Sequence, residues 1–330
     1  MRPKLLVLLL LTAAPGLASG QAPATPVLTT PHFAFYSDLR TNTHDALIAV
    51  AGARRSRRPD PFSPDEQTCF KSVPAAEREA WDHAVDDYVA GKSTRQQRLD
   101  ERWLLAGLIR ADAVGDPGDR EFLRQWTALL EAATAAYRQC RWPAQDALNR
   151  QWIDHVKPLL ATYEGVIGDE LPRLFATGWA GLPFRVDVVN VASFDGANSV
   201  SHDPPPTLHV LASSTHPTNQ GLAALETVFH EASHFLAQPE SPLNAALKNA
   251  AEHAAVTVPP DFLHEVQFFI TGEAVRRALA ARGETYVPNL FSLELFSVPF
   301  RENVSRIWVL EMDGRRTLDQ AADDLVRAMK

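Results

Sequence analysis

Residues 225–237 read LETVFHEASHFLA and place two histidines and a glutamate at a spacing that can do chemistry. His230 and His234 are four positions apart, so both imidazoles project from one face of a helix and can reach a single metal ion. Glu231 points about 100° around that helix from His230, so its carboxylate can contact a water on the metal without binding the metal. The pattern H-E-x-x-H predicts that His230 and His234 are zinc ligands and that Glu231 is a general base.

A catalytic zinc site needs a third protein ligand, because three side chains and one water complete its four positions. No histidine follows His234 on a short loop, so this ligand must come from further along the chain. Glu252 and His253 lie at the end of a short predicted helix, 242–254, where we expect them to be exposed.

Two better candidates, His264 and Glu273, share one predicted helix that runs from about Asp261 to Arg282. Nine positions separate them, which places them on opposite sides of the helix, so only one can face the metal. The face of Glu273 continues through apolar residues that are typical of a core stripe. We therefore expect His264 to be the third ligand and keep Glu273 as the alternative.

Two segments carry a resemblance to a known family. HEASHFL, at 230–236, resembles the active-site helix of zincin metallopeptidases, and TGEAVRR, at 271–277, is similar to the glutamate-bearing helix of their gluzincin branch. The resemblance covers about residues 180–285, but no clear gluzincin pattern supplies the third ligand. It implies a zincin-like fold for this half and a peptide or protein substrate. It also implies that the strand before the active-site helix, here TLHVLASS at 207–214, pairs with extended substrate.

A zinc site with Glu231 beside it predicts a hydrolase. In hydrolysis the metal polarises a carbonyl, and the carboxylate takes a proton from the attacking water. We expect a peptide bond to be cut, although the motif alone also fits another hydrolysed bond. Tyr286, which follows the long helix, and Arg276 are our candidates for stabilising the transition state. The alternative is an exported helical protein with a non-catalytic zinc site or none. Glu231 argues against it, because a structural site has no use for a base.

The spacing of apolar residues changes near residue 180. Before this point, apolar residues recur every three to four positions, whereas β-branched residues afterwards predict strands at 182–192 and 207–214, joined by a loop. The chain is therefore expected to be α+β and predominantly helical, with a small sheet beside the H-E-x-x-H helix. Predicted helices cover 43–55, 74–91, 95–112, 119–139, 144–167, 221–237, 242–254 and 261–282, with 54–66 as a loop.

These patterns divide the chain into three expected parts. Residues 1–20 have the basic start, the apolar run and the small residues of a signal peptide, cleaved after Gly20. Residues 21–178 form a mostly helical region, in which a strand near 32–37 can join the sheet. Residues 179–330 form the zincin-like catalytic region. We expect the mature protein to be exported, in the periplasm or secreted, without a membrane span.

The composition of the chain agrees with the prediction of an exported globular protein. Cys69 and Cys140 are the two cysteines of the chain, and an oxidising compartment favours a disulfide between them. A hydrophobic content of 45% in 330 residues is enough for a sizeable core. The net charge of −8 leaves no basic surplus, which argues against a nucleic-acid partner.

Overall fold

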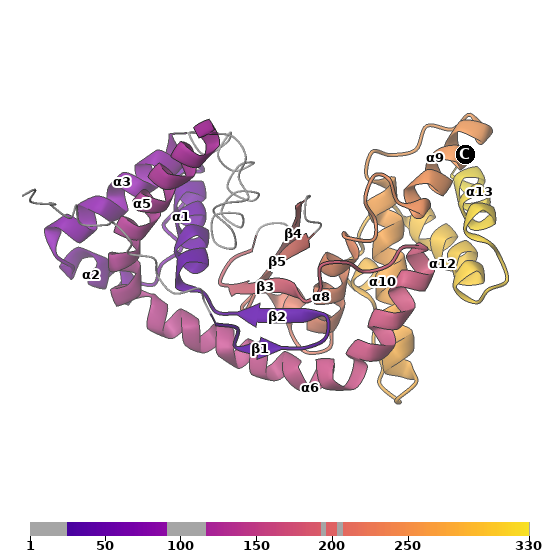
Figure 1. Cartoon of the computed structure of the whole chain (residues 1–330), viewed down its shortest axis with the longest axis horizontal. Helices are drawn as coiled ribbons and strands as arrows, with labels where there is room; N and C mark the ends of the chain where they lie inside the picture. Colours follow the sequence, from indigo (N-terminus) through magenta and orange to yellow (C-terminus); the bar gives the residue numbers. More distant parts are fainter. Residues whose placement is uncertain (1–24, 91–116, 193–195, 203–206, 330) are drawn as a thin grey trace, which may run out of the picture.

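The computed structural model describes residues 25–90, 117–192, 196–202 and 207–329. Within these ranges the chain is mostly helical and has one mixed sheet of five strands, which confirms the predicted α+β class (Figure 1). The predicted signal peptide at 1–20 and the predicted helix at 95–112 lie outside the described residues. No described helix combines the length and the apolar composition that crossing a membrane requires.

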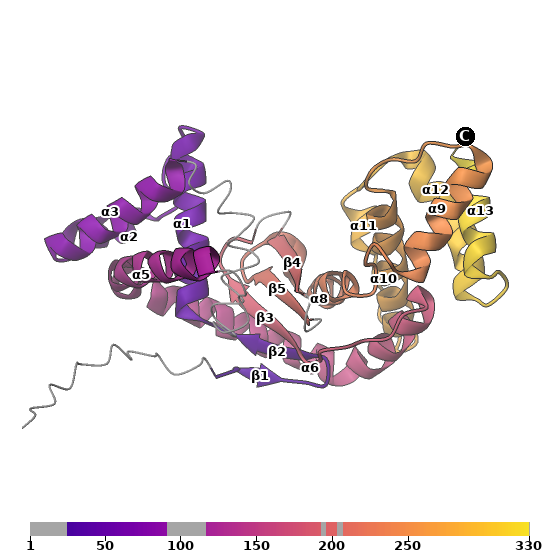
Figure 2. The same cartoon turned by 45° about the horizontal axis from the view of Figure 1, so that its top comes forward.

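The sheet lies at the centre of the molecule (Figures 1 and 2). Its strands are β1 (Leu28–Thr29), β2 (Phe33–Tyr36), β3 (Phe184–Val189), β4 (Ala197–His202) and β5 (Thr207–Ser213). They are arranged in the order β1-β2-β3-β5-β4, with β2, β3 and β5 parallel and the two edge strands antiparallel to their neighbours. The strand predicted near 32–37 therefore joins the sheet.

Strand β4 corrects two of our predictions. Residues 193–206 were expected to form a loop, because ANSVSH contains one β-branched residue and gives little sign of a strand. The segment 207–214 was expected to pair with extended substrate, but β5 already pairs with β3 on one side and β4 on the other. Its backbone hydrogen bonds are thus used within the sheet, and β4 is the edge strand on this side of it.

Among the described residues, four helices near the N-terminus pack around a core of their own, at the left of Figure 1. They are α1 (Leu39–Arg55), α2 (Pro64–Ser72), α3 (Ala75–Val89) and α5 (Pro117–Cys140). Helix α2 begins inside the segment 54–66 that we predicted to be a loop. Ser63 and Glu66 form a capping box there, which satisfies the free amide groups at the start of the helix.

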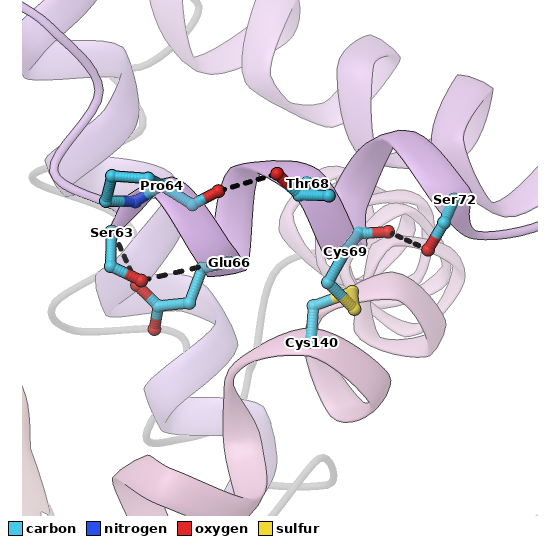
Figure 3. Close-up of a disulfide and its surroundings, with 7 residues drawn as sticks. All are labelled: Ser63, Pro64, Glu66, Thr68, Cys69, Ser72 and Cys140. Carbon is cyan, nitrogen blue, oxygen red and sulfur yellow. Dashed lines mark hydrogen bonds between the residues drawn. A yellow bond between two sulfur atoms is a disulfide. The ribbon is translucent and has the colours of Figure 1, made fainter.

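Cys69 on α2 and Cys140 at the end of α5 form the predicted disulfide (Figure 3). Their Cα atoms are 5.5 Å apart, and the bond joins residues 71 positions apart in the sequence. It therefore closes a loop that contains α3 and ties α2 to α5. Such a bond stabilises the fold chiefly by restricting the unfolded chain.

Seven further helices of the described residues follow the sheet in sequence. They are η2 (Pro217–Asn219), α8 (Ala223–Ser233), α9 (Pro242–Ala254), α10 (Phe262–Ala280), α11 (Asn289–Ser292), α12 (Val298–Met312) and α13 (Leu318–Ala328). Helix α9 has the bounds that we predicted, whereas α8 ends at Ser233, before the predicted end at residue 237.

The long helix α6 (Trp142–Phe175) runs along the lower edge of Figure 1, from the N-terminal helices to the C-terminal ones. We placed it in the region 21–178, yet its apolar face belongs to a larger core shared with the sheet and with α8. Trp152 and Leu160 of α6 are buried in this core together with Val186 of β3 and Val228 of α8. Both halves of the sequence therefore build the core that supports α8.

Candidate metal centre

Helix α8 carries the H-E-x-x-H motif and lies between the sheet and α10 (Figure 2). Three fully buried apolar residues fix its rotation within the larger core: Leu225, Val228 and Phe229. His230 and Glu231 are also buried, with exposed fractions of 5% and 7%. Although α8 ends at Ser233, His234 keeps helical backbone angles (φ −57°, ψ −26°) and so remains one turn after His230.

A buried polar contact between α8 and α10 sets the register that brings His264 to the motif. Gln267 donates to the carbonyl of His230 at 3.2 Å and to the hydroxyl of Ser233 at 2.9 Å. Thr271 donates to the same hydroxyl at 3.1 Å, and Ser233 donates to the His230 carbonyl at 2.7 Å. His264 precedes Gln267 by three positions and therefore shares its helix face.

His230, His234 and His264 form a compact group. Their ring centroids are 5.1 to 5.2 Å apart in all three pairs, and the Nε2 atoms of His230 and His264 are 3.2 Å apart. One potential ligand atom from each residue lies within 4.8 Å of the others, so the group could hold one metal ion. The structure thus brings together the three histidines that we predicted as ligands.

Burial keeps these imidazoles neutral, which is the form that binds metal. It lowers the pKa of His230 well below its ordinary value, and it also lowers the pKa of His234 and of His264. The Nδ1 atom of His230 is buried and has no hydrogen-bond partner among the described residues. The Phe268 ring lies 3.8 Å from the His230 ring, so packing rather than a second hydrogen bond orients this imidazole.

Glu231 lies beside this group of histidines. Its Oε2 atom is 3.9 Å from Nε2 of His234. Burial raises the pKa of Glu231 to about 7, and a hydrogen bond with Ser199 on β4 acts in the opposite direction. A carboxyl group whose pKa lies near neutrality suits the role of a general base.

A cavity of about 420 Å³ opens in front of the histidines and Glu231. Strand β4 and η2 contribute mostly polar lining, including Asn198, Ser199 and Asn219. The opposite wall is apolar and comes from α10 and the chain after α11: Phe268, Leu293, Leu295 and Phe296. Among the described residues, the cavity therefore has one polar wall and one apolar wall, and both border the histidines and Glu231.

Glu273, our alternative third ligand, lies outside the histidine group. It accepts hydrogen bonds from Arg276 and Arg277 at 2.6 to 2.8 Å. Burial alone raises the pKa of Glu273, but these two guanidinium groups lower it overall. Arg276 is therefore paired with Glu273, and neither lines the cavity in the described part of the chain. Glu252 and His253 are exposed on α9, as we expected.

Tyr286, our candidate for stabilising the transition state, is not among the described residues that line the cavity. Its hydroxyl donates to Glu226 of α8 at 2.6 Å. The backbone amide of Asn289 donates to the same carboxyl at 3.1 Å, and Asn289 does line the cavity. This geometry gives the Tyr286 hydroxyl a partner away from the cavity, so it does not favour a direct catalytic role.

Two positioning residues escaped sequence analysis. Ser199 holds the Glu231 carboxyl, and Asn219 fixes the strand that carries Ser199. The Asn219 amide donates to the carbonyls of Gly196 at 2.6 Å and Ser213 at 3.1 Å, while its oxygen accepts from Thr227 at 3.0 Å. It thereby joins the start of β4 and the end of β5 to α8. No local pattern could reveal these contacts, because they join segments that are distant in the sequence.

Three neutral imidazoles, a buried carboxyl and an adjacent cavity form a set that can bind a metal ion and accept a proton. The fold that carries this set is built from both halves of the chain. In comparisons with models of protein families, with curated proteins and with solved structures, the chain matches none.

Proposed function

We propose that this protein is a zinc-dependent peptidase, in which His230, His234 and His264 hold the metal and Glu231 is the general base. The position of Glu231 carries the proposal, because this buried carboxyl lies next to the three histidines and borders the same cavity. A purely structural zinc site is closed by four protein ligands and has no use for such a group. The resemblance of HEASHFL to zincin active-site helices points in the same direction.

Zinc suits this set of donors. Three imidazole nitrogens with a fourth position left for water are typical of catalytic zinc sites. Two nitrogens that bind one tetrahedral zinc at ~2.0–2.1 Å lie roughly 3.3 Å from each other. The Nε2 atoms of His230 and His264 are 3.2 Å apart, which agrees with that separation.

The edge strand β4 supports a peptide as the substrate. It borders the cavity through Ala197, Asn198 and Ser199, and Ser199 places it next to Glu231 of the motif. An extended peptide can add to a sheet edge through main-chain hydrogen bonds, which hold the chain without selecting its sequence. In this proposal β4 takes the role that we first expected for the segment 207–214.

When bound at the three histidines, zinc supplies a Lewis acid that polarises the scissile carbonyl and makes a water more acidic. Glu231 takes a proton from the attacking water as the new carbon–oxygen bond forms, and gives it to the amine as the carbon–nitrogen bond breaks. Ser199 holds the carboxyl through its hydrogen bond. Phe268 packs on His230 and keeps that imidazole aimed at the other two.

The test compares zinc-loaded wild-type protein with Glu231→Gln on a peptide mixture prepared from an unrelated protein. Mass spectrometry detects new peptide ends. The amide has the shape of the carboxyl but cannot take a proton, so the variant should keep its zinc and lose cleavage by about 100-fold or more. Glu240→Gln, at an exposed position shortly after the motif, is the matched control and should cleave normally. If Glu231→Gln is as active as wild type, this site does not catalyse the cleavage.

A further inference from the structure

The segment 293–296, between α11 and α12, forms an apolar wall next to the histidines. Leu293, Leu295 and Phe296 line the cavity together with Phe268. The ring of Phe296 lies 5.6 Å from that of Phe268 and 6.3 Å from that of His264, between centroids. The apolar wall therefore begins at the metal-site residues themselves.

The backbone of this segment has an uncommon shape. Glu294 and Phe296 have φ angles of 52° and 60°, in the left-handed region that side chains other than glycine rarely adopt. Nη1 of Arg301 donates to the carbonyls of Glu294, Leu295 and Phe296 at 2.8, 2.9 and 2.7 Å. Because one guanidinium binds three successive carbonyls, it offsets the backbone strain and fixes the direction of the Phe296 side chain.

The charges around the cavity restrict what this wall can bind. The described lining residues include no lysine or arginine, and Glu231 is their one carboxyl group. An acidic side chain of a ligand beside the apolar wall would find no cationic side chain, and a basic one would meet only the carboxyl that the reaction uses. Either would lose its hydration without a partner, whereas an apolar side chain gains by leaving water.

We propose that the segment 293–296 is a specificity subsite for a large apolar side chain, of the leucine or phenylalanine type, next to the bond that is cut. Arg301 is its positioning residue, because it holds the backbone that carries Leu295 and Phe296. This inference rests on the proposed function, since the zinc site defines which bond lies beside the wall. Leu293 forms the outer end of the subsite, where its side chain is 40% exposed.

Hydroxamates test the subsite without catalytic turnover, because they bind an open zinc position directly. The hydroxamic acids of leucine, phenylalanine, aspartate and lysine, and acetohydroxamate with no side chain, are titrated into zinc-loaded protein by calorimetry. The leucine and phenylalanine probes should bind about tenfold or more tightly than the aspartate and lysine probes. Acetohydroxamate reports the metal position alone.

Two variants test the named residues. Leu293→Asp changes an exposed position, and it should weaken the leucine probe and strengthen the lysine probe, each by about tenfold. Arg301→Gln should reduce the preference for apolar probes by about fivefold or more, because the wall loses its support. Arg306→Gln, an exposed arginine of the same helix, is the control and should leave every affinity unchanged. Zinc content and acetohydroxamate binding should stay constant throughout.

The outcomes separate this inference from the proposed function. Equal affinity for the four amino-acid probes, with acetohydroxamate still bound, would overturn the subsite and leave the zinc site standing. Zinc-loaded protein that fails to bind acetohydroxamate would have no open metal position, and both proposals would fall. A folded Arg301→Gln variant with unchanged preference would reject the positioning role. If Arg301→Gln does not fold, Leu293→Asp decides whether the wall selects the side chain.

Discussion

The hydroxyl of Tyr286 donates a hydrogen bond of 2.6 Å to Glu226, which lies one turn before His230 on α8. Glu226 is 1% exposed and also accepts the backbone amide of Asn289 at the start of α11. Gly272 makes this approach possible, because a Cβ there would lie 3.0 Å from the Glu226 carboxyl and 2.8 Å from Pro288. The pair thus ties the chain that leads to the apolar wall of the cavity to the motif helix.

Tyr286→Phe should therefore affect stability more than catalysis. Removing the hydroxyl deprives a buried carboxyl of one partner, which should lower the free energy of unfolding by roughly 1–3 kcal/mol. Zinc content should stay at the wild-type level, and kcat should change less than about tenfold. Urea unfolding and peptide cleavage measure the two effects. A loss of kcat above about 100-fold at unchanged stability would instead restore the transition-state role that we first predicted.

Glu226 should make the stability of the protein depend on pH. Burial raises its pKa from 4.5 to about 7, although Tyr286 and Asn289 act in the opposite direction. Since the pKa is higher in the folded state, the contribution of Glu226 is complete below about pH 4.5 and is lost as the pH rises to about 7.

The measurement compares the unfolding free energies of wild type and Glu226→Gln, both without zinc, across this range of pH. The advantage of wild type over the variant should shrink by about 3 kcal/mol between the two pKa values. Glu302→Gln, at an exposed position on α12, serves as the control and should follow wild type. Parallel curves for wild type and Glu226→Gln would show that Glu226 does not titrate in this way.

The local patterns of the sequence predicted much of this site because helix geometry is local. His264 and Glu273 lie on opposite sides of one helix, and the apolar stripe on the Glu273 side favoured His264 as the metal ligand. The structure places His264 with the motif and pairs Glu273 with two arginines. β4 and the partner of Tyr286 escaped prediction because they depend on tertiary contacts. ANSVSH becomes a strand through pairing with β5, and the Tyr286 hydroxyl meets Glu226 because the chain after α10 folds back over α8.

The disulfide should stabilise the N-terminal helices without supporting the metal site. Cys140 packs against the smaller core and is bonded to Cys69, whereas the three histidines belong to elements of the larger core. Replacing both cysteines by serine frees a loop of 71 residues and should lower stability by up to about 4 kcal/mol. Calorimetry measures that loss, and elemental analysis of the folded variant should still find zinc. A folded variant that has lost its zinc would show that the two cores are coupled.

The zinc content of the purified chain tests the metal centre most directly. Elemental analysis after dialysis, with zinc supplied during purification, should find about one zinc per chain in wild type and in Glu273→Ala. His230→Ala, His234→Ala and His264→Ala should each retain far less, because two remaining imidazoles leave the site open. If Glu273→Ala loses zinc while His264→Ala keeps it, the third ligand is the glutamate. Less than about a tenth of an equivalent in wild type would contradict a zinc site altogether.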